Sequence, residues 1–327
     1  MSQSPIYRAL PTLAGQACLA GGWCRFDTVE RLPGGVCAVG DLDPEVLRKL
    51  TSPRAAICGL PMDRPQIMGI LNVTPDSFSD GGRLTDVGGA VDAAIQMVSQ
   101  GATILDIGGE STRPGAAYVE VGEEIDRTVP VIAELSRVLS VPISIDTRKS
   151  EVAKAAVKAG ASLINDVSAM EFDPDMASVA AEAGVPICLM HAQGTPETMQ
   201  RNPTYEDVVG EVLTHLAGRV DAALAAGIPA ERIIVDPGIG FGKTLEHNLA
   251  LLSHLSVLHS LGVPVLVGAS RKRFIGTLTN VEAADERVHG SVAVALAAVA
   301  QGAQILRVHD VEATAQALKI WQAIHAP

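Results

Sequence analysis

The sequence predicts an α/β protein built as a (β/α)₈ barrel, the TIM-barrel plan, with an N-terminal extension. Eight apolar runs alternate with eight helix-like segments, and polar or ionisable residues follow every run. Short links containing Gly or Pro precede several runs, as expected where a helix ends and a strand begins. An open doubly wound sheet is the alternative, and it needs fewer parallel strands in one domain. We divide the chain of 327 residues into an extension at 1–62, packed on the barrel, and a barrel at 63–327.

We interpret the extension as a segment folded onto the main domain and not as an independent enzyme, because glycine pairs and prolines interrupt it. A short helix is expected at 43–50, where Asp43 supplies a cap and Pro44 a first-turn proline. Two roles remain open for this region, a short helix that plugs the bottom of the barrel or a dimer contact.

The barrel strands are predicted from apolar runs without a polar face, as in parallel strands covered by helices on both sides. These runs are 66–71, 103–107, 141–145, 161–164, 185–190, 232–235, 263–267 and 303–308. The helix-like segments between and after them are 88–100, 120–139, 150–159, 174–183, 204–226, 245–260, 285–301 and 312–325.

Polar side chains stand where each predicted strand ends. In chain order they are Asn72; Asp106 with Glu110, Thr112 and Arg113; Asp146 to Lys149; Asn165 and Asp166; His191; Asp236; Ser270 to Lys272; and Arg307 with His309. The carboxyl ends of barrel strands meet on one face, where the active sites of this fold lie. The sequence therefore predicts one site built from many strands.

The formal net charge of −12 argues against nucleic acid or an anionic membrane as the main partner. An anionic ligand must then be held by a local cationic cluster. Arg113, Arg307 and His309, with Lys272 nearby, form such a cluster, and an extended segment places Arg307 and His309 on the same side. It would suit a diphosphate with Mg²⁺, for which Asn72 offers the oxygen ligand.

Asp146 and Asp236 could grip a heterocycle through its N–H donors, since buried carboxylates persist only when they are paired or hydrogen-bonded. Asn165 offers the same ring a donor and an acceptor. Each residue could instead cap a strand or brace a loop. Together with Lys272 they describe a pocket for a polar, fused aromatic ring.

Other motifs carry less weight. Gly242-Lys243-Thr244 resembles the tail of a phosphate-binding P-loop, but position 237, where that motif needs its first glycine, is Pro. A glycine-rich mobile loop over a flat ligand, with Phe241 as a stacking or wall residue, fits better. Zinc could be considered for six of the histidines, His191, His247, His254, His259, His289 and His309, yet the sequence contains no HExxH motif and no close His pair at a strand end, which disfavours a zinc site. Cys188 lies inside an apolar run and is expected to be a core thiol.

The five cysteines are odd in number and lack CxxC spacing, which favours free thiols in a reducing compartment. The first residues lack the pattern of a signal peptide, and no apolar run approaches the length of a membrane span. We therefore expect a cytoplasmic protein. The segment 290–300 is apolar nearly all round and could be buried or form a dimer surface.

Seven sequence blocks together resemble the dihydropteroate synthase family, and the similarity spans roughly residues 66–320. The blocks are NVTPDSFSDGG at 72–82, GGESTRPGA at 108–116, SIDTRK at 144–149, IND at 164–166, DPGIGFGK at 236–243, SRK at 270–272 and RVHDV at 307–311. The resemblance implies a transferase of folate biosynthesis that condenses 7,8-dihydropterin-6-ylmethyl diphosphate with 4-aminobenzoate. It also implies release of diphosphate and competition by sulfonamides at the aminobenzoate site. We expect a homodimer, although the oligomeric state cannot be read from the sequence.

Carried over by position, the resemblance assigns Asn72 to Mg²⁺ and diphosphate, with Arg113, Arg307 and His309 on the same anion. It assigns Asp146, Asn165, Asp236 and Lys272 to the pterin, and it places Thr112, Pro114, Phe241 and Ser270 around the aminobenzoate. Asp146, Lys272 and Arg113 would take part in the chemistry. Departure of diphosphate before the amine attacks is our hypothesis for the order of steps, and Asp80 could pair with Arg113 in a flap over the second substrate. The functional meaning of Arg148 stays open.

Two rival functions are kept. A methyltransferase that uses a pterin-binding barrel would share Asp146, Asn165 and Asp236, but it has no use for a diphosphate cluster. A pterin-binding protein without turnover is the other rival, and Lys272, Arg307 and His309 argue weakly against it.

Overall fold

The computed structural model describes residues 6–12, 14–73, 87–111, 115–195 and 198–325. Three predicted site residues, Thr112, Arg113 and Pro114, lie outside this part of the chain, as does the proposed flap with Asp80. Their roles stay predictions.

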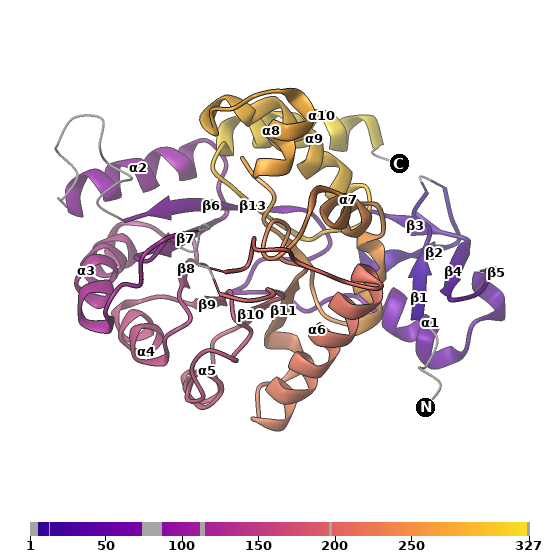
Figure 1. The fold of residues 1–327 in the computed structure, drawn as a ribbon, viewed down its shortest axis with the longest axis horizontal. Coiled ribbons are helices and arrows are strands. Elements are labelled where there is room, and N and C mark those ends of the chain that lie inside the picture. Colours follow the sequence, from indigo (N-terminus) through magenta and orange to yellow (C-terminus); the bar gives the residue numbers. More distant parts are fainter. Residues whose placement is uncertain (1–5, 13, 74–86, 112–114, 196–197, 326–327) are drawn as a thin grey trace.

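Eight parallel strands form the barrel predicted from the sequence (Figure 1). They are β6 (Gln66–Asn72), β7 (Ile104–Gly108), β8 (Ile143–Asp146), β9 (Leu163–Asp166), β10 (Ile187–Met190), β11 (Ile233–Asp236), β12 (Leu266–Val267) and β13 (Ile305–Val308). Hydrogen-bonded neighbours follow the order β11-β10-β9-β8-β7-β6-β13-β12, and a parallel bridge between Val235 and Val265 joins the two ends. The closed sheet excludes the doubly wound alternative.

Helices surround the barrel as the alternating pattern requires. They are α2 (Val87–Ser99), α3 (Val121–Val138), α4 (Ser150–Ala159), α5 (Met176–Ala183), α6 (Val208–Ala225), α7 (Leu245–Ser253), α8 (Arg273–Thr279), α9 (Val288–Val299) and α10 (Val311–His325), with 3-10 turns η4 (Ala230–Arg232), η5 (Leu255–Leu261) and η6 (Asp285–Arg287). The predicted helix 245–260 is thus α7 followed by η5. The short α8 was not expected, because seven residues are too few to reveal a helical period.

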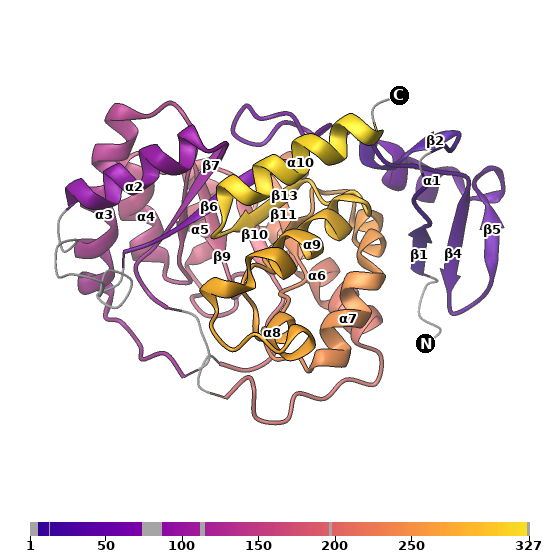
Figure 2. The same ribbon diagram turned by 90° about the horizontal axis from the view of Figure 1, so that it is seen from above.

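The extension contains more structure than the sequence indicated. Strands β1 (Ile6–Ala9), β4 (Thr28–Leu32) and β5 (Val36–Ala38) form an antiparallel sheet, and β2 (Ala17–Cys18) pairs with β3 (Arg25–Phe26). One 3-10 turn, η1 (Leu19–Gly21), lies between β2 and β3, and a second, η2 (Val39–Asp41), follows β5. The expected helix is α1 (Pro44–Thr51), capped by Asp43, whose carboxylate accepts a 2.8 Å hydrogen bond from the Glu45 amide. Both ribbon views place this unit at one side of the barrel, beyond α7 (Figures 1 and 2).

The end of the barrel opposite the predicted site is filled by a turn of the extension. Ile57 and Met62 are fully or almost fully buried against an interior layer near the starts of the strands, made of Met68, Ile104, Leu163, Cys188, Ile234, Leu266 and Ile305. The backbone of Ile57 and Leu60 forms a bridge across this turn. The plug is therefore a turn and not the short helix we considered. The division of the chain at residue 62 stays a prediction.

Cys188 belongs to this buried layer, which agrees with a core thiol. All five cysteines are free. Within the described ranges, no helix combines the length and apolar character needed to span a membrane.

Candidate active site

Three predicted ring-binding residues come together at the carboxyl ends of three barrel strands. Asp146 ends β8, Asn165 lies one residue before the end of β9, and Asp236 ends β11. All three are buried, with 3% to 5% of their surface exposed. Asp146 and Asn165 are paired in the sheet register, so their side chains are neighbours. The parallel arrangement brings residues far apart in sequence to one face of the barrel.

Arg307 joins this group through two short ion pairs. Its Nε donates to Oδ2 of Asp106 and its Nη2 donates to Oδ2 of Asp146, both at 2.6 Å. Asp106 is fully buried in β7, and its Oδ2 also accepts a 3.1 Å hydrogen bond from Asn165 Nδ2. The guanidinium is thus turned toward two carboxylates, and its predicted contact with diphosphate stays a prediction.

The role of Asp106 was missed in the sequence, where we noted it only as a polar residue at the end of the second run. A carboxylate in the middle of the run TILDI was the available signal, because burial requires a partner for it. That partner is 201 positions away, and no spacing pattern in the sequence points to it.

Two carboxylates of the site, Asp146 and Asp236, have raised pKa values. Burial raises the pKa of Asp146 to about 7, partly offset by the attraction of Arg307. Burial likewise raises the pKa of Asp236 to about 6, against the hydrogen bond from the Gly238 amide and the charge of Lys272. Among the described residues, Oδ1 of Asp106 and Oδ1 of Asp146 have no hydrogen-bond partner. Two buried acceptors are therefore available to N–H donors of a ligand.

Asn72 lies at the end of β6, beside these carboxylates. Its register partner in β7 is Gly108, which in turn is the partner of Asp146. A Cβ atom at Gly108 would lie 3.4 Å from Oδ1 of Asn72 and 3.8 Å from Oδ2 of Asp146. A glycine here therefore leaves room for ligand atoms between the Asn72 amide and the carboxylate.

Lys272 and Phe241 form a second part of the site. The Lys272 ammonium lies 3.9 Å from the centre of the Phe241 ring, a cation–π contact. Lys272 immediately precedes α8, and Phe241 belongs to the glycine-rich segment after β11. The two residues assigned to different substrates are thus in contact.

Hydrogen bonds connect the glycine-rich segment 237–242, which we predicted to be a mobile loop, to neighbouring segments. The Gly240 amide donates to Asn248 Oδ1 and the Gly240 carbonyl accepts from Gln200 Nε2, both at 2.7 Å. The Gly242 carbonyl accepts a 2.8 Å bond from the hydroxyl of Tyr205. Gly238 has φ +65°, and a Cβ there would lie 1.8 Å from the His191 carbonyl oxygen, so only glycine fits.

Ser270 and His309 form a pair on the same face. Nδ1 of His309 lies 3.1 Å from Oγ of Ser270, and the His309 amide donates to the same oxygen at 3.2 Å. The predicted cationic cluster is therefore divided in the described chain, with His309 against Ser270 and Arg307 against carboxylates.

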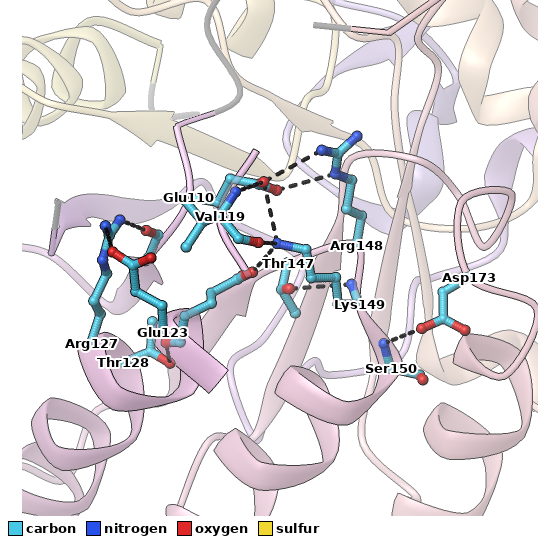
Figure 3. A network of polar contacts seen from close by, with 12 residues as sticks. Glu110, Val119, Glu123, Arg127, Thr128, Thr147, Arg148, Lys149, Ser150 and Asp173 are labelled. Atoms are coloured by element: carbon cyan, nitrogen blue, oxygen red, sulfur yellow. Dashed lines mark hydrogen bonds and ion pairs between the residues drawn. The ribbon is translucent and has the colours of Figure 1, made fainter. Parts of the chain in front are cut away.

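A buried ionic network connects the ends of β7 and β8 (Figure 3). Lys149 Nζ donates to Glu124 Oε2 and to the Val119 carbonyl, both at 2.6 Å, and lies 3.2 Å from Glu110 Oε1. Glu110 accepts from the Val119 amide at 3.0 Å and from Arg148 Nε at 3.1 Å. The network thus joins residues on either side of 111–118, the stretch that carries Thr112, Arg113 and Pro114.

Arg148, which the sequence left unexplained, has a structural setting. Besides its contact with Glu110, its guanidinium lies 4.1 Å from the centre of the Phe172 ring. Arg148, Phe172 and Phe241 help to line a cavity of about 200 Å³. Asp146, Asn165 and Asp236 are not among the residues that line this cavity.

His259 has the packing role that its place in a helix-like segment indicated. His259 is fully buried and its Nε2 lies 3.1 Å from the Gln301 carbonyl, as expected for a packing residue. In the residues that the structure covers, no group of three or more His, Cys, Asp or Glu side chains could hold a metal ion.

Comparison with known proteins agrees with this geometry. The model of the pterin-binding enzyme family matches residues 68–309. The chain is 54% identical over 268 residues to a dihydropteroate synthase of Neisseria meningitidis serogroup B, a match that covers 80% of this chain and 94% of that protein. The chain belongs to the dihydropteroate synthase family.

Solved structures of this family have the same fold. The dihydropteroate synthase of Xanthomonas albilineans with 4-aminobenzoic acid has a TM-score of 0.80 and 52% identity, covering 85% of this chain and all of that one. The same organism's enzyme in complex with 7,8-dihydropteroate has a TM-score of 0.77 and 49% identity over 84% of this chain and all of that one.

Proposed function

We propose that this protein catalyses the dihydropteroate synthase reaction, in which 7,8-dihydropterin-6-ylmethyl diphosphate and 4-aminobenzoate give 7,8-dihydropteroate and diphosphate. The supporting observation is the buried group of Asp106, Asp146, Asn165, Asp236 and Arg307 at the strand ends. Its unpartnered acceptors suit the N–H donors of a pterin. The related structures with 4-aminobenzoic acid and with 7,8-dihydropteroate support the same reaction.

We assign the pterin to Asp146, Asn165, Asp236 and Lys272. A guanidine-like ring edge presents two donors side by side, which a carboxylate can accept together. Donors that replace lost water also lower the cost of keeping a buried carboxylate ionised. Binding of the ring therefore stabilises the ionised forms of Asp146 and Asp236, whose pKa values burial has raised.

We assign the diphosphate to Arg307, His309 and Arg113, with Mg²⁺ held by Asn72 as its protein ligand. Mg²⁺ prefers oxygen ligands and usually shares them among a few protein groups, waters and substrate phosphates. The amide oxygen of Asn72 beside Gly108 fits this pattern. When bound, the ion would neutralise charge that develops on the leaving diphosphate.

The charges in the site support the order of steps that we propose. The C–O bond to diphosphate breaks first, and the pterin ring shares the positive charge left on the methylene carbon. Ionised Asp146 accepts hydrogen bonds from the ring and stabilises that positive charge. The amine of 4-aminobenzoate then forms the C–N bond and loses a proton. Phe241, Ser270, Thr112 and Pro114 border the place from which it attacks.

A product assay tests the function. The purified protein is mixed with the pterin diphosphate, Mg²⁺ and 4-aminobenzoate, and dihydropteroate is measured. Pterin binding without product would favour a binding protein, and methyl transfer from methyltetrahydrofolate would favour the rival enzyme. Release of diphosphate from the pterin substrate before 4-aminobenzoate is added would support the proposed order of steps.

We also propose a homodimer in a reducing compartment, the cytoplasm. Ala293 and Ala297 are exposed on α9, while Ser291, Ala295 and Ala298 are buried, so this helix shows one small apolar face to solvent. The five free cysteines suit a reducing environment. Analytical ultracentrifugation tests the dimer, and a mass equal to one chain would contradict it.

A further inference from the structure

The lysine of the Gly-Lys-Thr motif lies inside the protein and not in a phosphate-binding loop. Lys243 is 3% exposed, and Thr244 caps α7 by accepting a hydrogen bond from the His247 amide. The Lys243 ammonium is 2.9 Å from Nδ1 of His191 and 3.0 Å from the Phe241 carbonyl oxygen, with the His191 carbonyl oxygen at 3.4 Å. A lysine ammonium has three N–H donors, and here each has an acceptor.

A buried lysine without a carboxylate partner is costly to maintain. In the part of the chain that the structure describes, Lys243 makes no ion pair, and burial lowers its pKa to about 7, against the attraction of Asp236. His191 stays neutral, because burial and the charge of Lys243 lower its pKa to about 2. An apolar side chain would avoid this cost, so the contacts of Lys243 call for an explanation beyond filling space.

The contacts of Lys243 join two segments that border the site. His191 follows β10, and Phe241 follows β11. The segments lie in close contact, because a Cβ at Gly242 would be 2.4 Å from the Gln193 carbonyl oxygen. Lys243 links them by binding the Nδ1 of one and the carbonyl of the other, and the Phe241 ring then contacts the Lys272 ammonium.

We propose that Lys243 is a positioning residue that holds the Phe241 ring against Lys272 and thereby forms the wall met by 4-aminobenzoate. This inference rests on the proposed function, which places Phe241 at the second substrate and Lys272 at the pterin. Lys243 touches neither substrate. Its removal should mainly affect the second substrate, because Asp146 and Asn165 are held by contacts that do not involve it.

The first test replaces Lys243 by Met, which keeps most of the length and removes the three donors. We expect the KM for 4-aminobenzoate to rise about tenfold or more, since small misplacements of a binding group are costly. At pH 8, above the pKa of about 6 at Asp236, the Kd for a free dihydropterin should change less than about threefold. Lys158→Met on the exposed face of α4 is the matched control and should match the wild type. Equal weakening of both ligands would overturn the proposal.

A double-mutant cycle provides the second test. If Lys243 acts through Phe241, then Lys243→Met combined with Phe241→Ala should have a KM within about twofold of Phe241→Ala alone. If the KM effects of Lys243→Met and Phe241→Ala multiply in the double variant, the two residues act independently, and the proposal is overturned. Should Lys243→Met fail to fold, Lys243→Gln is measured in the same cycle. Its side chain is one bond shorter and has two N–H donors, so it cannot keep all three contacts of Lys243. A KM effect that multiplies with that of Phe241→Ala would overturn the proposal.

The wild type is assayed first, so that two failures are told apart. Absence of dihydropteroate from the wild type contradicts the proposed function. Product from the wild type together with unchanged kinetics in Lys243→Met contradicts only the role of Lys243.

Discussion

Replacing Arg307 by Met tests the electrostatic core of the site. The variant keeps an apolar stem but removes the cation that pairs with both Asp106 and Asp146, whose side chains are 0% and 6% exposed. Removing one partner of a buried ion pair costs about 3–5 kcal/mol of unfolding free energy. Two carboxylates lose their partner here, so we expect a loss of about 3 kcal/mol or more at pH 8.

The loss should depend on pH, and the sign follows from Asp146. Its pKa in the folded protein is about 7, and the attraction of Arg307 lowers that value. Without Arg307 the folded pKa rises further, and each further unit costs about 1.4 kcal/mol at a pH above it. As the pH falls through that pKa, the folded carboxyl takes up a proton and this cost disappears.

Urea unfolding followed by circular dichroism at pH 8 and pH 6 measures both effects. The difference from the wild type should be largest at pH 8 and clearly smaller at pH 6. Arg137→Met on the exposed surface of α3 is the control and should match the wild type at both values. An equal loss at both pH values, or a loss below about 1 kcal/mol at pH 8, would refute this reasoning.

Three further predictions use the same structure. Calorimetric titration with a dihydropterin should show a Kd that falls as the pH rises through about 6 to 7, because ionised Asp146 and Asp236 accept the ring donors. The same dependence of Kd on pH in Asp146→Asn would count against this prediction. Lys149→Met should lower the melting temperature strongly, since it leaves fully buried Glu124 without the Lys149 cation. A shift no larger than that of Lys158→Met would contradict a stabilising role of the ionic network. Met62→Ala should cost about 2–5 kcal/mol of unfolding free energy without changing KM, because the plug lies opposite the site; a changed KM would contradict that placement.

The barrel could be predicted because parallel strands covered on both faces leave uninterrupted apolar runs in the sequence. The polar residue after each run then marks one face of the barrel, and this rule alone brought Asp146, Asn165 and Asp236 together. The order of runs and polar residues along the chain was sufficient to place these side chains, since the barrel fold determines on which face each strand ends.

Side-chain partners were harder to predict than positions. Arg307 pairs with a carboxylate 201 residues away, and Arg148 pairs with Glu110 across 38 residues. Such pairs depend on the rotamers chosen inside a packed barrel, which no local pattern reveals. The sheet of the extension was missed for a different reason, because its strands have two to five residues and mixed polarity.

A crystal structure of the protein with 7,8-dihydropteroate tests the central claim most directly. The pterin ring is predicted to donate hydrogen bonds to Asp146 and Asp236 and to contact Asn165, with the aminobenzoyl ring against Phe241. A pterin bound instead in the cavity lined by Arg148 and Phe172, with the carboxylates still facing only Arg307, would contradict the account.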